Sequence, residues 1–130
     1  MKLLVDNDLP PRLGRGLGAL FAGEHHVEHM KDKFGTGSLL DAEWIERLGK
    51  EGGWCVLSGD RRIAKQKPSR DLFLRAGLIG FFALPTVRKM PFNEQTARIL
   101  IMWPAMTIMS ETIAQGCFEL PIKGRLRQMA

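Results

Sequence analysis

Two kinds of apolar pattern alternate along the chain. Short, nearly continuous apolar runs at 2–5, 54–58 and 78–84 stop at turn residues, which is typical of buried strands. Between them apolar residues recur at helical spacing, as in the segment that begins at Pro10-Pro11 and ends at Gly23. The full set of predicted elements is strands at 2–5, 25–30, 54–58, 78–84 and 118–122, and helices at 10–23, 39–49, 69–76 and from about 93 to 116.

The order of these elements predicts the fold class. Strand and helix alternate, and the strands are apolar on both faces, so we expect an α/β fold with a mainly parallel sheet of four to five strands and helices on both faces. The 130 residues predict a single domain, with its core over 1–85 and a long helix and edge strand within 92–123. The last strand is placed at an edge because Pro121 lacks an N–H group.

The composition predicts a folded protein without a membrane segment. Apolar residues make up 45% of the chain and charged residues 25%. The longest apolar stretch, 99–109, contains Pro104 and is only about half as long as the roughly 20 residues that span a bilayer. The N-terminal apolar run meets Asp6 too early for a signal peptide, and Cys55 and Cys117 are lone thiols that suit a reducing compartment. We therefore expect a cytoplasmic protein.

Acidic residues stand where a parallel sheet places its ligands. Asp6 and Asp60 each follow a predicted strand, and Asp41 begins the helix that precedes the strand at 54–58. Ligand crevices of open parallel sheets lie beyond the carboxyl ends of the strands. Three carboxylates that converge there repel one another unless a cation joins them, and hard oxygen donors select Mg²⁺ or Mn²⁺.

Structural roles stay open for two of the acids. Ser38 and Asp41 have the spacing of a capping box before an apolar run. Asp8 precedes the helix start at Pro10-Pro11 and is more typical of a helix cap than of a ligand. Asp6 and Asp60 have no comparable structural role.

Three segments then carry a family resemblance: Asp6-Asn7-Asp8-Leu9-Pro10-Pro11-Arg12-Leu13, Asp41-Ala42-Glu43-Trp44-Ile45 and Leu57-Ser58-Gly59-Asp60-Arg61-Arg62-Ile63. In this order they resemble the PIN-like nuclease superfamily, and within it the compact branch of VapC-type toxins. The resemblance covers residues 2 to about 84, and the tail from Phe118 to Met129 is similar in the same branch. It implies a three-layer PIN-like sandwich.

The resemblance also implies an activity. It suggests a Mg²⁺- or Mn²⁺-dependent endoribonuclease in which Asp6, Asp41 and Asp60 bind metal and act in catalysis, with an RNA substrate and a cognate antitoxin protein as partners. The fuller family carries one more acid, on a helix pair that this chain lacks. The candidates to replace it are Asp8 and Glu43, as possible support for the metal ligands, and also Glu28 and Asp32.

Positive charge follows the last acid closely. Residues 61–130 carry 12 Lys/Arg against 4 Asp/Glu, whereas residues 1–60 carry 7 against 10. A nuclease needs cations beside its acidic centre to hold the phosphate backbone. The predicted RNA-binding residues are Arg61, Arg62, Lys65 and Lys67, unless this segment is simply a solvated loop. Aromatic residues do not interleave the run, so it does not indicate base stacking.

Other patterns favour structural explanations. The glycines at 14, 16 and 18 follow the helix start instead of forming the strand–helix turn, so we expect close packing on the sheet and no dinucleotide site. The histidines at 25, 26 and 29 would alternate faces of a strand and have no nearby cysteine, which argues against zinc. The long helix over about 93–116 has more apolar surface than one face needs, and a homodimer or partner contact could use the excess.

These observations predict a metal-dependent endoribonuclease, the toxin of a type II toxin–antitoxin pair. Two alternatives remain. One is a catalytically silent PIN-like scaffold that only binds a partner. The other is a receiver-type signalling domain, in which an aspartate accepts a phosphoryl group with the help of a lysine at a late strand end, where Lys123 is the only candidate.

Overall fold

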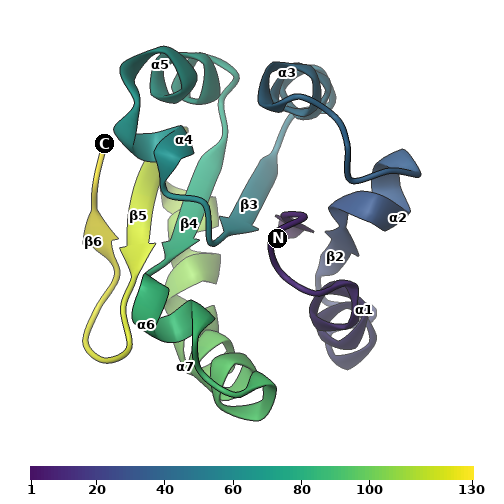
Figure 1. The fold of residues 1–130 in the computed structure, drawn as a ribbon, viewed down its shortest axis with the longest axis vertical. Helices are drawn as coiled ribbons and strands as arrows, with labels where there is room; N and C mark the ends of the chain where they lie inside the picture. The colour runs from purple at the N-terminus through teal and green to yellow at the C-terminus, as the bar shows by residue number, and fades with distance from the viewer.

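The computed structural model describes residues 1–130 and contains one six-stranded sheet with strand order β2-β1-β3-β4-β5-β6 (Figure 1). Strands β1 to β5 are parallel, and β6 pairs antiparallel with β5. The strands are β1 (Lys2–Val5), β2 (His26–His29), β3 (Trp54–Ser58), β4 (Ile79–Ala83), β5 (Gly116–Leu120) and β6 (Arg127–Gln128). The helices are α1 (Pro11–Leu20), α2 (Met30–Phe34), α3 (Asp41–Glu51), α4 (Arg62–Lys65), α5 (Lys67–Arg75), α6 (Pro85–Arg88) and α7 (Phe92–Thr112).

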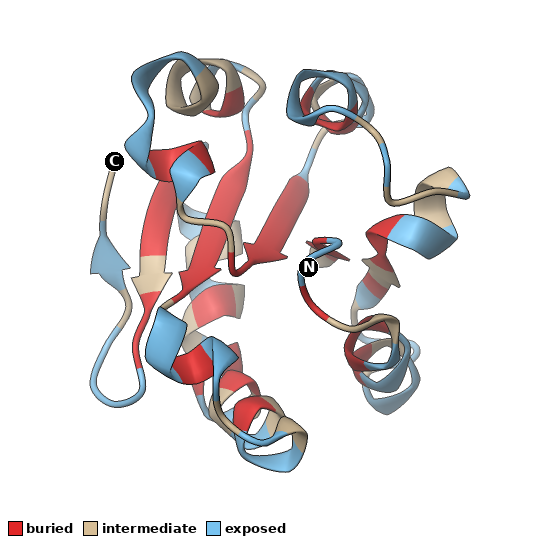
Figure 2. Cartoon of the chain, viewed as in Figure 1, coloured by how far each residue is buried: buried red, intermediate tan, exposed pale blue.

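Helices cover both faces of the sheet, as the apolar strands predict (Figures 1 and 2). On one face α1 and α7 pack over Leu3, Val5 and other side chains of the same orientation. On the opposite face α3 and α5 pack over Leu4, Val56 and their neighbours. Side chains of successive strand residues point to opposite faces, so a continuous apolar run supplies both cores at once. The predicted three-layer α/β sandwich is confirmed.

The sheet edge differs from the prediction. The sheet has six strands instead of four to five, and β5 lies between β4 and β6 instead of at the edge. Pro121 is compatible with this position because β5 ends at Leu120, before the proline. The edge strand β6 has only two residues, both exposed, and so leaves no apolar pattern in the sequence.

Three short helices were not predicted. They are α2, α4 and α6, with five, four and four residues, and α4 occupies the segment that we expected to be a basic loop. His29 begins α2, since its Nδ1 accepts a hydrogen bond from the Lys31 N–H at 3.1 Å. Helices of one turn present too few apolar positions for their spacing to be recognised.

Most of the apolar surface of α7 is used within the chain. Met102, Trp103 and Met106 are buried against the sheet. Ile101 and Ile108 are the large apolar side chains of this helix that stay exposed. None of the helices combines the length and apolarity needed to cross a membrane.

The glycines of α1 separate into two kinds. An added Cβ would meet the His29 backbone nitrogen at 3.0 Å from Gly14 and the Val27 carbonyl oxygen at 2.9 Å from Gly18. The predicted close packing on the sheet is therefore confirmed for these two. Gly16 faces open space and is not packed.

The different surroundings of Gly16 and Gly18 predict opposite effects of alanine at two positions of the same helix. Gly16→Ala should raise the free energy of unfolding by about 0.5–1 kcal/mol, because alanine reduces the entropy lost on folding without meeting a neighbour. Gly18→Ala should lower it by about 1–3 kcal/mol, because helix or strand must shift. Urea denaturation of both variants measures the two effects, and an equal gain in both would contradict the packing of α1 on β2.

Candidate functional site

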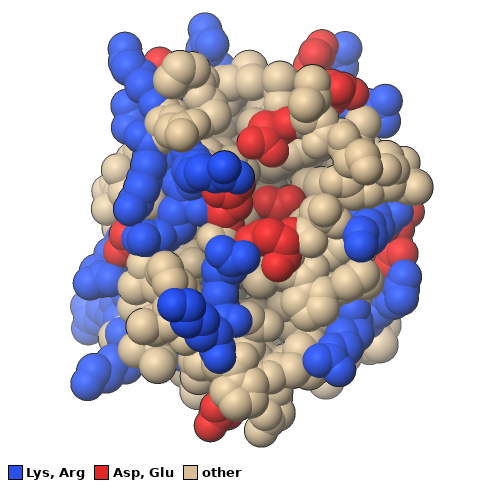
Figure 3. Space-filling model, in the orientation of Figure 1, with Lys and Arg blue, Asp and Glu red and all other residues tan.

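The parallel register brings several acids to one edge of the sheet. Val5 pairs with Leu57, so β1 and β3 end side by side, and Asp6 and Asp60 follow these ends. The first turn of α3 places Asp41 at the same edge. A pocket of about 200 Å³ lies there, lined by Asp6, Asn7, Asp8, Met30, Gly37, Leu39, Asp41, Trp44 and Asp60. Figure 3 shows acidic side chains gathered in a hollow at the centre of this face.

Asp6 is the buried member of the group and is held in place by both strands. Its Oδ2 accepts a hydrogen bond from Ser58 Oγ at 2.7 Å, and its Oδ1 accepts one from the Asn7 N–H at 2.6 Å. Ser58 Oγ in turn accepts the Asp60 N–H at 2.9 Å. The last residue of β3 thus links the two acids that follow neighbouring strands.

Burial dominates the electrostatics of Asp6 and Asp8. Burial raises the pKa of Asp6 to about 6, opposed by the Ser58 hydrogen bond and reinforced by the charges of Asp8 and Asp41. Burial also raises the pKa of Asp8, opposed by the Gly59 backbone and by Arg88. Both carboxylates are therefore costly to charge without an additional cation.

Asp41 and Asp60 each have a partner within the chain. Asp41 Oδ1 accepts a hydrogen bond from Trp44 Nε1 at 3.1 Å. No side chain caps α3, so the capping-box interpretation of Ser38 and Asp41 is wrong. Asp60 accepts two hydrogen bonds from the Arg62 guanidinium, each at 2.9 Å, which lowers the pKa of its carboxyl group.

Asp8 joins the pocket and does not act as a helix cap. The N-cap position of α1 is Pro10, with no side-chain hydrogen bond. Asp8 Oδ2 lies 3.6 Å from Arg88 Nη2, and the lack of a side chain at Gly59 leaves room for this ion pair. The chain therefore brings a fourth carboxylate to the pocket, from the loop between β1 and α1.

The other acids proposed as replacements lie elsewhere. Glu43 is exposed in the first turn of α3 and does not line the pocket. Glu28 pairs with His26 at 2.6 Å, and Asp32 pairs with Arg15 at 2.8 Å. Of the four candidates, only Asp8 is placed with Asp6, Asp41 and Asp60.

A basic cavity of about 420 Å³ adjoins the carboxylates. It is lined by Asp8, Gly59, Asp60, Arg61, Arg62, Lys65, Pro85 and Arg88. Arg62 and Lys65 are exposed, whereas Arg61 is half-buried with its Nη1 3.4 Å from Glu119 Oε1. Lys67 lies at the start of α5 and does not line this cavity. The basic segment therefore contributes three of its four predicted residues, and Figure 3 shows basic side chains next to the acidic centre.

Two residues of the site were missed by sequence reasoning. Ser58 is the last residue of β3, where its hydroxyl bonds to Asp6. Arg88 ends α6, directly after the carboxyl end of β4, and pairs with Asp8. The sequence signal that could have identified them is their position, at or after the carboxyl end of a central strand, because parallel sheets bind ligands there.

The donor set of the pocket suits a hard divalent cation. Its ligating groups are carboxylates, which Mg²⁺ and Mn²⁺ prefer, and two of them have raised pKa values that a cation would lower. No three acidic, histidine or cysteine side chains form a ready metal-ligand group in this conformation. Asp60 has both oxygens paired with Arg62, whereas Asp41 bonds to Trp44 through Oδ1 alone and has Oδ2 available for a metal.

The site lacks the lysine that a receiver-type domain uses. Lys123 is exposed between β5 and β6 and does not line the carboxylate pocket. No other lysine lines that pocket. Phosphoryl transfer of the receiver type therefore has no support in this arrangement.

The burial of Asp6 gives a pH-dependent prediction for protein kept in a chelator. Between the unfolded pKa of 3.8 and the folded value of about 6, the folded state binds more protons, so stability falls as the pH rises. Asp6→Asn removes this penalty; its Oδ1 can still accept the Asn7 N–H, whereas its Nδ2 must donate to Ser58 Oγ, which reverses that hydrogen bond. At pH 7.5 it should raise the free energy of unfolding by about 3 kcal/mol.

The gain from Asp6→Asn should shrink as the pH falls below about 6 and disappear by about pH 3, below both pKa values, where both states are protonated. Millimolar Mn²⁺ should stabilise the wild type more than the variant, because a ligand of the folded state raises stability by mass action. Thermal melts across pH, with and without metal, measure both effects. If Asp6→Asn is less stable than the wild type at pH 7.5 in chelator, the folded protein stabilises the charged form of Asp6, which contradicts the predicted penalty.

Comparison with family models supports the identity suggested by this geometry. A model described as a PIN-like domain matches residues 1–84, which span β1 to β4 and contain all four pocket carboxylates. Comparison with curated proteins and with solved structures finds no match. The chain belongs to the PIN-like domain family.

Proposed function

We propose that the protein is a metal-dependent endoribonuclease whose centre is formed by Asp6, Asp41 and Asp60, with Asp8 beside them. The observation that carries the proposal is the convergence of these four carboxylates in one pocket, directly beside a cavity lined by four cationic side chains. An acidic centre favours a divalent cation, and a basic rim favours a polyanion. Membership of a family with a nuclease-type fold supports the same activity.

The chain's own residues have distinct tasks in this proposal. Asp6, Asp41 and Asp60 would hold Mg²⁺ or Mn²⁺, which supplies an activated water and neutralises charge on the phosphate. Ser58 orients Asp6 through its 2.7 Å hydrogen bond. Arg62 and Lys65 would hold the RNA backbone, because both are exposed on the cavity next to Asp60. Arg62 would release Asp60 when it turns to phosphate.

Replacing Asp60 tests the proposed centre. Asp60→Asn should abolish Mg²⁺- or Mn²⁺-dependent cleavage of single-stranded RNA, while the melting temperature in chelator changes little because Asp60 is partly exposed. RNA binding in chelator should be retained or strengthened, since Arg62 loses its ion pair. A gel assay of cleavage and a binding titration measure both effects.

Asp71→Asn is the matched control, because Asp71 is a surface acid on α5 that lines neither cavity. It should cleave like the wild type. Cleavage by Asp60→Asn at the wild-type rate would overturn the assignment.

The basic cavity predicts a change in salt dependence. The double variant Arg62→Ala/Lys65→Ala should bind RNA more weakly and reduce the slope of log affinity against log salt by about 1.4, or about 0.7 per lost phosphate contact. Lys50→Ala/Arg75→Ala, which removes two cations from a cavity between α3 and α5, is the control and should keep the wild-type slope. If Arg62→Ala/Lys65→Ala keeps the wild-type slope of log affinity against log salt, RNA does not bind at the basic cavity.

The VapC-type resemblance supports a finer proposal, namely that this nuclease is a toxin restrained by an antitoxin protein. The expected genetic context is a small reading frame for a DNA-binding protein next to the gene. Expression of the chain alone should arrest growth, and co-expression of that neighbour should relieve the arrest. Growth arrest by Asp60→Asn would show that any toxicity is independent of cleavage.

A further inference from the structure

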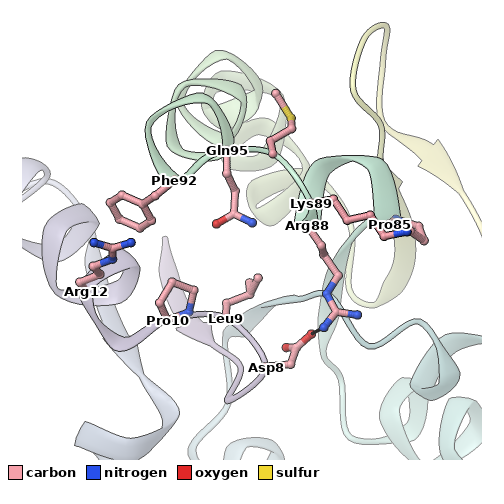
Figure 4. Close-up of a pocket in the computed structure, with 10 residues that line it drawn as sticks. Asp8, Leu9, Pro10, Arg12, Pro85, Arg88, Lys89, Phe92 and Gln95 are labelled. Atoms are coloured by element: carbon pink, nitrogen blue, oxygen red, sulfur yellow. Dashed lines mark ion pairs between the residues drawn. The ribbon is translucent and has the colours of Figure 1, made fainter.

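A further cavity, of about 470 Å³, opens beside the proposed centre (Figure 4). It lies between the start of α1 and the segment that runs from α6 into the first turn of α7. Asp8 lines both this cavity and the carboxylate pocket, and Arg88 lines both this cavity and the basic one. One extended ligand can therefore reach from the carboxylates into this space, whose volume is within the roughly 300–1,000 Å³ of small-molecule sites.

A buried amide points into the cavity. The Gln95 side chain is only 5% exposed, and Figure 4 shows its amide directed into the space between α1 and α6. Its Nε2 donates one long hydrogen bond, of 3.4 Å, to the Val87 carbonyl oxygen. Its Oε1 accepts no hydrogen bond from the protein. Because Oε1 is open to the cavity and not sealed in the protein, the amide offers an acceptor and a donor to a ligand there.

An aromatic ring and a guanidinium form one end of the cavity. The Arg12 guanidinium lies over the Phe92 ring, 4.0 Å from its centroid. Figure 4 shows this pair across the cavity from Arg88. Unpaired bases of RNA stack on aromatic rings and on guanidinium planes. The pair is therefore suited to a flat heteroaromatic ring.

Positive charge completes the cavity. Arg12, Arg88 and Lys89 line it, against a single acid, Asp8, which is already paired with Arg88 at 3.6 Å. The excess charge favours an anion. A stacking surface, an amide and an anion site in one cavity match three features of a nucleotide: the flat ring of its base, the hydrogen-bonding edge of that base, and its phosphate.

We propose that this cavity binds one nucleotide of a single-stranded RNA, next to the phosphate that is cut. The base stacks on the free face of the Arg12 guanidinium, which Phe92 supports from the other side, Gln95 forms hydrogen bonds with the edge of the base, and Lys89 and Arg88 contact the adjoining phosphates. The proposal deepens the proposed ribonuclease function and rests on it for the position of the cut. The strand is single because a paired base cannot turn its edge toward Gln95.

Binding in a chelator tests the subsite without cleavage. Labelled single-stranded RNA homopolymers of A, C and U are titrated with wild type, Gln95→Met and Phe92→Leu. Wild type should prefer one base by about 5-fold or more, and Gln95→Met should remove the preference, because methionine keeps the volume but lacks the amide. Phe92→Leu should weaken binding of all three by about 5-fold or more, through lost stacking. Its salt slope should stay unchanged because no phosphate contact is lost.

Phe34→Leu is the matched control for the aromatic variant. Phe34 is also half-buried and also has a guanidinium near its ring, Arg47 at 5.7 Å, but it lies on α2 outside the cavity. It should bind RNA like the wild type. If Gln95→Met fails to fold, Arg12→Met and Phe92→Leu still test the site, since Arg12 is exposed and Phe92 is only half-buried.

Several results would overturn the subsite. In the first, Phe92→Leu and Phe34→Leu bind single-stranded RNA equally well. In the second, Gln95→Met keeps the base preference of the wild type. In the third, the wild type binds duplex RNA as tightly as single-stranded RNA. Nucleoside monophosphates that bind as tightly as the homopolymers would instead assign the cavity to a free nucleotide. The cleavage assay separates the two proposals. If the wild type cleaves RNA but Phe92→Leu binds it as well as the wild type does, only the subsite proposal is wrong. If Phe92→Leu binds more weakly but the wild type shows no metal-dependent cleavage, only the nuclease proposal is wrong.

Discussion

Four carboxylates share a pocket of about 200 Å³ at one edge of a parallel sheet, and the cost of keeping them charged, which comes mainly from the burial of Asp6 and Asp8, is the constraint to which the surroundings respond. The arrangement follows from topology: β1 and β3 are parallel neighbours, so the residues after both strands meet. Burial raises the pKa of Asp6 to about 6 and also raises that of Asp8. The fold thus maintains a group of charges that costs stability, which is typical of functional sites.

Nearby groups balance this charge only in part. Arg62 pairs with Asp60 and Arg88 with Asp8, while Asp6 has only uncharged hydrogen-bond donors. The most buried carboxylate, Asp6, therefore has no cationic partner within the chain. A divalent cation would remove this imbalance, and the arginines, once released, would lie beside it with a preference for phosphate. One electrostatic argument accounts for both the acidic pocket and the basic cavity.

The parts of this site that follow from local pattern were predictable from sequence, and those that depend on distant segments were not. Asp6 and Asp60 were identified because a charge that ends a buried strand has no structural task. The role of Asp8 was misjudged because Arg88, from a segment 80 residues away, decides its orientation. Phe92 was missed for the same reason, since only the fold brings it opposite Arg12.

The same distinction holds for the fold. Continuous apolar runs predicted three of the parallel strands, β1, β3 and β4, and the two covered faces of the sheet. The strand β6 has two exposed residues, so no pattern could reveal it. The last parallel strand was placed at the edge because Pro121 was counted within it, whereas β5 ends at Leu120. Likewise, the spacing of the α1 glycines could not distinguish Gly18, which contacts the β2 backbone, from Gly16, which does not.

The most direct test of the central claim is where Mn²⁺ binds. The chain has three tryptophans, and two indole N–H groups donate to carboxylates: Trp44 to Asp41 in the pocket, and Trp54 to Glu51 outside it. In an NMR titration, paramagnetic Mn²⁺ should broaden the Trp44 indole signal first and leave that of Trp54 sharp, and excess Mg²⁺ should reverse the effect. Equal broadening of the two signals, or none at stoichiometric Mn²⁺, would contradict a metal centre at these carboxylates.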